Sequence, residues 1–238
     1  MAIAPDELVA ARIEALFRLA PDGDLIEKNS LERGEAPSVF VTVGRAAVAV
    51  AFRTDFARDR RPAIEELVRR RPQADWVIDG VPAPVVEALR SLVSGGRPVR
   101  DESQGPAFAF PDRLPEVPEA VEIDGASVDL IRRMVPEATA EALETMRPSL
   151  AILDGGYAVS QCYSTRRGAV AHEAGVDTLP EYRRRHLGSR VVAAWARAVR
   201  DRGAVPVYST SFDNVASRAL ARSAGLVPLA FDLRFTIG

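Results

Sequence analysis

Three consecutive arginines, Arg183–Arg185, precede the most regular amphipathic stretch of the chain. Residues 186–189 connect the arginines to this stretch and include its first residues. The sequence predicts a strand, a turn and then a helix that begins near Arg184. The first turn of a helix has unpaired backbone N–H groups and the positive end of the helix dipole. The segment therefore has the chemistry to bind an anion such as a pyrophosphate or a sulfate. The alternative is that the arginines form a solvated surface run.

A carboxylate and an imidazole lie side by side in the preceding stretch, HEAGVDT. Glu173 is surrounded there by small or apolar residues, and a buried carboxylate in such a strand favours pairing with an ammonium. His172 is its neighbour and should face the opposite side of the strand. Gly175 indicates a bulge or a close approach of another chain segment. The alternative for Glu173 is a structural carboxylate, paired with an arginine or exposed on an edge.

The elements that must position these residues alternate regularly in the second half of the chain. Strands are expected at 149–154, 156–164 and 168–178, a helix at 187–202, a strand at 206–210, a helix at 214–223 and extended chain at 226–237. Short strands at 107–111 and 120–124 and two short helices within 127–146 precede them.

The first half has its own alternation of helices and strands. Helices are expected at 5–19, 62–71 and 84–94, two strands within 38–52 and one strand at 75–79. Residues 95–106, GGRPVRDESQGP, combine glycine, proline and charge, which is typical of a linker. The sequence thus predicts an N-terminal α/β domain at 1–106 and a second domain at 107–238.

The stretch from Ala171 to Leu226 resembles the GCN5-related N-acetyltransferase (GNAT) superfamily. In that family a strand is followed by an Arg/Gln-x-x-Gly-x-Gly/Ala loop that opens a helix, and Arg183–Gly188 is the matching segment. The next strand of the family leads to an Asn at the start of a helix, here Asn214. The wording HEAGVDT-x-PEYR and DN-x-ASRALA is most similar to stand-alone bacterial acetyltransferases that include zwittermicin-type resistance members.

The resemblance implies a mixed α/β fold with a mostly antiparallel sheet flanked by helices. It also implies an acetyl-CoA-dependent N-acetyltransferase in which a primary amine attacks the thioester directly, without an acyl-enzyme. The cofactor-binding positions carried over from the family are Val176, Thr178, Arg183, Arg184, Arg185, His186, Leu187, Gly188, Ser189, Asn214 and Ser217. Glu173 is the best candidate for the general base, with His172 as the lesser alternative.

Two positions depart from the family pattern. His186 stands where the loop normally has glycine, and Ala221 stands where many members carry a tyrosine that protonates the leaving thiolate. Tyr208, on the preceding strand, is the candidate replacement for that acid. These departures favour the alternative function, a non-catalytic module that binds coenzyme A or regulates a partner.

Composition limits the other possibilities. The 238 residues carry a formal net charge of −2, which argues against generic nucleic-acid binding. One cysteine, Cys162, and two histidines exclude an all-cysteine zinc site and disfavour any metal centre. Cys162 and Trp195 are expected in the core, whereas Trp76 fits either a core or an interdomain contact.

The expected surroundings of the protein follow from the same features. The chain shows no membrane-spanning run and no signal-like start, so a cytoplasmic location is expected. The expected partners are a small-molecule or peptide amine and at most a second copy, as a monomer or homodimer. Residues 1–106 could shape the acceptor pocket, form a lid or be a degenerate copy of the same fold.

Overall fold

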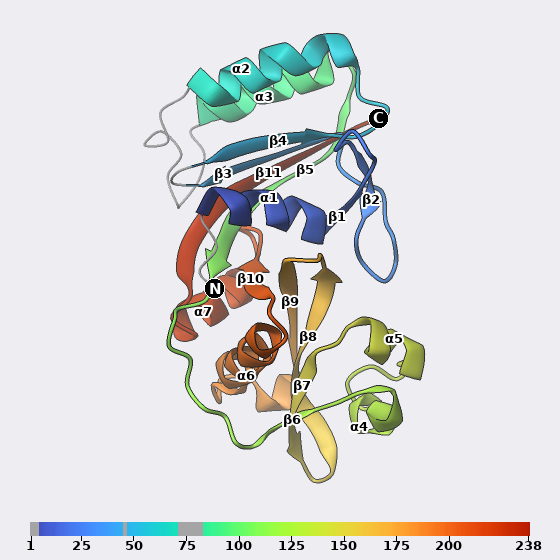
Figure 1. The fold of residues 1–238 in the computed structure, drawn as a ribbon, viewed down its shortest axis with the longest axis vertical. Helices are drawn as coiled ribbons and strands as arrows, with labels where there is room; N and C mark the ends of the chain where they lie inside the picture. Colours follow the sequence, from blue (N-terminus) through green and yellow to red (C-terminus); the bar gives the residue numbers. More distant parts are fainter. Residues whose placement is uncertain (1–4, 45–46, 71–82) are drawn as a thin grey trace.

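The computed structural model describes residues 5–44, 47–70 and 83–238 (Figure 1). Nine strands form one sheet in the order β4-β3-β11-β5-β10-β9-β8-β7-β6, beside a two-stranded ribbon of β1 and β2. Among the described strands, β9 and β10 form the one parallel pair, and every other pair is antiparallel. The mixed, mostly antiparallel sheet with flanking helices predicted from the sequence is confirmed.

The helices are α1 (Pro5–Leu16), η1 (Arg58–Arg60), α2 (Arg61–Arg70), α3 (Ala83–Ser94), η3 (Gly125–Ser127), α4 (Val128–Ile131), α5 (Ala140–Thr145), η4 (Pro180–Tyr182), α6 (Leu187–Asp201) and α7 (Val215–Ser223). The strands are β1 (Phe17–Leu19), β2 (Leu25–Lys28), β3 (Val39–Gly44), β4 (Val48–Phe52), β5 (Val99–Ala109), β6 (Ala120–Glu122), β7 (Ser149–Asp154), β8 (Tyr157–Arg167), β9 (Ala171–Thr178), β10 (Val205–Ser209) and β11 (Val227–Ile237). The expected strands and helices after residue 149 all form, within a few residues of their expected bounds.

Two expectations change. The first helix ends at Leu16 rather than residue 19, because the next three residues pair with β2. The helix expected to begin near Arg184 begins at Leu187. The expected strand at 75–79, with Trp76, lies outside the described residues.

The expected linker at 95–106 is wrong for most of its length. Residues from Val99 onward form β5, an eleven-residue strand that pairs with β11 along nearly its whole length. Residues 100–104 of this strand are charged or polar and none of them is buried, because backbone hydrogen bonds to β11 hold this part of the strand without apolar side chains. The sheet therefore runs continuously across residue 106, and the division into two domains there stays a prediction.

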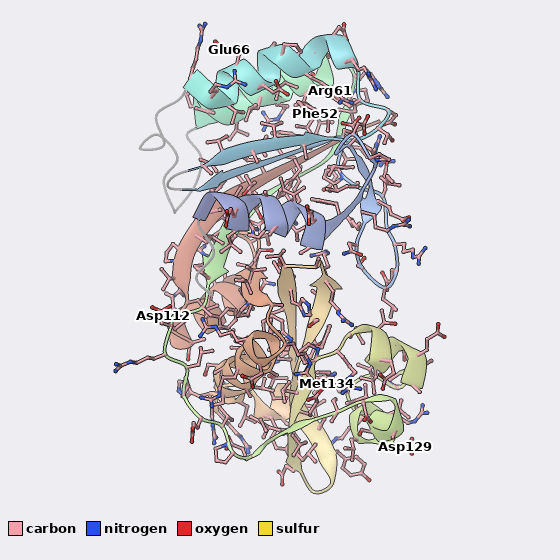
Figure 2. All side chains as sticks on the ribbon, in the orientation of Figure 1. Phe52, Arg61, Glu66, Asp112, Asp129 and Met134 are labelled. Atoms are coloured by element: carbon pink, nitrogen blue, oxygen red, sulfur yellow. The ribbon has the colours of Figure 1, made fainter. Side chains whose placement is uncertain are left out.

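Helices cover both faces of the sheet. At the β3–β4 end, α2 and α3 pack on Val39, Val41 and Val43, whereas α1 packs with Phe40 on the other face (Figure 1). Arg61 at the start of α2 lies over the Phe52 ring, 5.0 Å from its centroid, and Figure 2 labels both. These contacts follow the two-residue alternation of a strand.

The other end of the sheet holds the second core. The apolar face of α6, with Trp195 fully buried, packs against β7, β8, β9 and β10. Cys162 is also fully buried, as expected, and burial raises the pKa of its thiol well above the usual value. On the opposite face, Leu8 and Ala11 of α1 contact Ala171 and Val207. The residues of β9 and β10 that share this face therefore point towards α1.

No described helix combines the length and the apolar character that crossing a membrane requires.

Candidate acyl-transfer site

A cleft opens where β9 and β10 separate. The register pairs the two strands only from Ala171 to Glu173 of β9. Beyond that point, Tyr208 and Ser209 of β10 pair with β5, whereas β9 continues against β8. The resulting cleft of about 890 Å³ is lined by β9, the following loop, the end of β10 and α7.

Gly175 has the close contact that the sequence indicated. A Cβ atom at this position would lie 2.6 Å from Cε2 of Tyr163 on β8. The Tyr163 hydroxyl donates to Asp177 Oδ2 at 3.0 Å, so the ring lies along β9 next to the cleft. The partner strand carries the irregularity, between Ser164 and Arg166.

The loop before α6 forms one wall of the cleft. Arg183 donates from Nε to the Thr178 carbonyl at 3.3 Å. Arg184 and His186 both have positive φ, 61° and 58°. Arg183, Arg184, His186, Leu187, Gly188 and Ser189 line the cleft. Arg185 is not among the lining residues, and its guanidinium lies 4.9 Å from the centroid of the Tyr182 ring.

The first turn of α6 presents backbone donors beside these arginines. The first hydrogen bond of the helix runs from the Arg190 N–H to the His186 carbonyl, so the N–H groups of residues 187–189 precede the helical ladder. A Cβ atom on Gly188 would lie 2.9 Å from Cδ1 of Leu220 on α7. Glycine thus lets the start of α6 approach α7 closely, and the arrangement suits an anion.

The free edge of β9 supplies two further donors. The Leu179 N–H donates to Val159 on the β8 side. Because backbone groups alternate in direction along a strand, the N–H groups of Val176 and Thr178 face the opposite edge, towards the cleft. Both residues line the cleft. These donors lie where an oxyanion could be bound.

Glu173 occupies the point at which the strands part. It is 2% exposed and lines the cleft. Its Oε1 accepts a hydrogen bond from the Ser209 hydroxyl, whereas the buried Oε2 has no hydrogen-bond partner among the described residues. A buried carboxylate oxygen without a donor is suited to accept a proton or a hydrogen bond from an amine.

His172 is absent from the lining of the cleft, whereas Glu173 belongs to it; the sequence predicted that the two face opposite sides of the strand and left open which one faces the pocket. Its Nδ1 lies 3.1 Å from the Ser164 hydroxyl, which also accepts from Trp195 Nε1 on α6 at 3.2 Å. Burial, followed by the charges of Arg167 and Arg202, lowers the pKa of His172 to about 4. His172 is therefore a neutral core residue beneath α6, and Glu173 is the member of this pair that lines the cleft.

Tyr208 and α7 form the remaining wall. The Tyr208 hydroxyl lies 2.6 Å from Ser217 Oγ, and both side chains line the cleft. Burial raises the pKa of Tyr208, and the hydrogen bond with Ser217 offsets part of that rise. Asn214 caps α7 by accepting the Ser217 N–H at 2.9 Å, and it lines the cleft as well. Ala221 is fully buried in the core and lies outside the lining.

Sequence reasoning missed two arginines at the Glu173 end of the cleft. Arg166 of β8 and Arg234 of β11 both line it, and the Nε atom of each is buried without a hydrogen-bond partner among the described residues. They come from strands that lie far apart in sequence. The available signal was charge within apolar strand sequence, as in FDLRF, where Asp232 and Arg234 alternate with buried Phe231, Leu233 and Phe235.

The family model named GNAT acetyltransferase matches residues 149–228, which span β7 to the start of β11. This range holds the cleft strands, the loop and both helices of the site. A comparison with curated proteins finds no match.

Three solved structures are similar to this chain. A GCN5-related N-acetyltransferase from Kribbella flavida superposes with a TM-score of 0.52 at 17% identity, over 100% of this chain and 96% of that one. A GNAT-family acetyltransferase from Colwellia psychrerythraea gives 0.49 at 10% identity, over 80% and 76%. A GCN5-related N-acetyltransferase-like protein from Streptococcus suis gives 0.44 at 18% identity, over 96% and 99%. The first of these shows that the fold is shared.

Proposed function

We propose that this chain is an acetyl-CoA-dependent N-acetyltransferase acting on a primary amine. The match to the GNAT acetyltransferase family model and the shared fold support the superfamily and the transferase class. The observation that carries the proposal is the juxtaposition of three features at the parting of β9 and β10. These are the unpartnered Oε2 of buried Glu173, the free N–H groups of β9 and the donor-rich start of α6. Similarity to the zwittermicin-resistance subgroup stays a prediction from the sequence.

The residues of the loop fit the phosphates of coenzyme A. The early N–H groups of α6 and the guanidinium groups of Arg183 and Arg184 supply donors and positive charge, and Gly188 lets this turn pack closely against Leu220 of α7. Leu187 and Ser189 lie in the same turn, and Asn214 and Ser217 extend the polar lining along α7. The guanidinium group of Arg185 lies over the Tyr182 ring, so Arg185 could contact a phosphate only outside the cleft.

When bound, acetyl-CoA supplies the thioester carbonyl: the amine nitrogen bonds to that carbon, the C–S bond breaks and the coenzyme leaves as its thiol. Glu173 takes the proton that an ammonium must lose before its nitrogen can attack, because free amines are mostly protonated at neutral pH. The N–H groups of Val176 and Thr178 stabilise the negative charge on the carbonyl oxygen. No side chain is acylated, so transfer is direct within a ternary complex.

Tyr208 is the group available to return a proton to the leaving sulfur. A phenol is protonated at neutral pH, and burial raises the pKa of Tyr208 further; its hydroxyl is hydrogen-bonded with that of Ser217. The family tyrosine position is the buried Ala221, so Tyr208 fills the role from the strand rather than from the helix. Solvent is the alternative proton source.

The first experiment is a calorimetric titration with acetyl-CoA, coenzyme A and ATP, followed by release of free thiol in the presence of candidate amines. Micromolar binding of acetyl-CoA but not ATP, with amine-dependent thiol release, is the expected result. Binding without turnover on any amine would favour the second candidate, a non-catalytic coenzyme A-binding module. His186 favours that candidate, since its ring lies at the loop with Nδ1 3.2 Å from Ser223 Oγ. Absence of binding would overturn both.

A further inference from the structure

A cluster of charged side chains lies between α1 and the sheet, at the Glu173 end of the cleft. Arg12 of α1 is fully buried and donates to both carboxylate oxygens of Asp232, at 3.2 and 2.7 Å. Arg12 is thus the main partner of Asp232, and Nη2 of Arg234 lies farther away, 3.8 Å from Oδ2 of Asp232. The remaining charges of the cluster are Arg166 and Glu173.

These groups share the face of the sheet that carries α1. Glu173 follows Ala171, which packs on α1, by two residues, and β8 places Arg166 directly opposite Glu173. Arg234 is opposite Phe40, which packs beneath α1. This face is opposite to the one that α6 covers, and the cleft between the parted strands connects the cluster with the loop before α6.

The cluster has more positive than negative charge. It holds three guanidinium groups and two carboxylates, so one positive charge is uncompensated. No carboxylate of the described residues lies within ion-pair distance of Arg166, and the Nε atoms of Arg166 and Arg234 lack hydrogen-bond partners. Burial and the charge of Arg234 lower the pKa of Arg166. Proton uptake by Glu173 during transfer would leave the excess larger by one.

An anion in the cleft would complete this arrangement, because guanidinium groups bind carboxylates through paired, charge-assisted hydrogen bonds. We propose that the acceptor is a small amino acid, whose amine faces Glu173 and whose carboxylate is bound between Arg166 and Arg234. The inference rests on the proposed function and deepens it. A free amino acid carries its ammonium and its carboxylate on one carbon, which matches a carboxylate and an arginine pair at the same end of one cleft.

The test compares amines that differ only in the anion. Thiol release from acetyl-CoA is measured with the common L-amino acids, with their amides, with simple alkyl amines and with aminomethylphosphonate. The expected result is a kcat/KM for amino acids at least about tenfold above that of the matched amides. Equal rates for amides or alkyl amines would overturn this inference and leave the acetyltransferase standing. A preference for the phosphonate over glycine would overturn the carboxylate assignment.

Variants locate the anion site. Arg166→Gln and Arg234→Gln should each raise KM for the amino acid about ten- to hundredfold, with unchanged affinity for acetyl-CoA. The matched control is Arg167→Gln, an exposed neighbour of Arg166 on β8. Arg166→Lys should recover part of the affinity, and melting curves verify that each variant is folded. Unchanged KM in both glutamine variants would overturn the inference, and no transfer to any amine despite acetyl-CoA binding would overturn it together with the proposed function.

Discussion

The two carboxylate oxygens of Glu173 have different surroundings. Ser209 holds Oε1, and the buried Oε2 has no protein partner among the described residues. Glu173→Gln keeps the size and the Ser209 contact but removes the basic oxygen. We expect kcat to fall about 100-fold or more, with little change in the Kd of acetyl-CoA. Thiol-release kinetics and calorimetry measure the two; the control is Glu181→Gln, an exposed partner of Arg133. Full turnover in the glutamine variant would remove Glu173 from the base role.

His172 gives the molecule a measurable dependence of stability on pH. Its folded-state pKa of about 4 lies below the ordinary 6.5, so the unfolded chain binds the proton more tightly. The stabilisation is complete above pH 6.5 and is lost as the pH falls towards 4. We expect His172→Gln to reduce the drop in Tm between pH 7 and pH 4.5, by on the order of 5 °C. The sequence has two histidines, so His186→Gln is the matched control. Parallel pH profiles for wild type and His172→Gln would contradict the assignment.

Among the elements, the order of strands and helices after residue 149 was predictable because each has a regular period and a turn or cap at its end. Gly203 and Gly225, both with positive φ, follow α6 and α7. The strand β5 was not predictable, because residues 100–104 are charged or polar and gain their order from backbone bonds to β11. The composition of a segment indicates whether its side chains are buried. It does not indicate that the backbone of this segment pairs with a strand more than 100 residues further along the chain.

The contact between α6 and α7 sets the shape of the turn that we propose to bind phosphate. Gly188→Ala adds a Cβ atom 2.9 Å from Cδ1 of Leu220, and Gly188→Val adds more bulk at the same place. We expect the valine variant to weaken acetyl-CoA binding about tenfold, and the alanine variant to weaken it less, since Leu220 can move. Leu220→Ala should restore part of the affinity in Gly188→Val. Calorimetry on the single and double variants gives the coupling, and strictly additive effects would mean that the contact does not shape the site.

At the scale of the whole molecule, the site depends on parts of the chain that no local motif connects. The sequence predicted loop 183–188, Glu173 and Asn214 as site residues from a stretch of 56 residues, and all of them line one cleft except Arg185 of that loop. Arg234 lines the cleft from the C-terminal strand, which belongs to the same continuous sheet as β9. The first helix packs on β9 and holds Asp232 through the buried Arg12. The first half of the chain therefore contributes the wall behind Glu173, which favours the pocket-shaping role among the three that the sequence left open.

This continuity predicts how the chain responds to division at residue 106. A fragment of residues 107–238 lacks β3 and keeps only three residues of β5, so most of β11 would have no neighbouring strand. Without α1, the face with Ala171 and Val207 would also be exposed. We expect the fragment to show no cooperative melting and to bind the dye ANS, and co-expression with residues 1–106 to restore a folded complex. Cooperative unfolding of the isolated fragment together with acetyl-CoA binding would establish it as an independent domain, and the wall behind Glu173 would then be dispensable for the cofactor site.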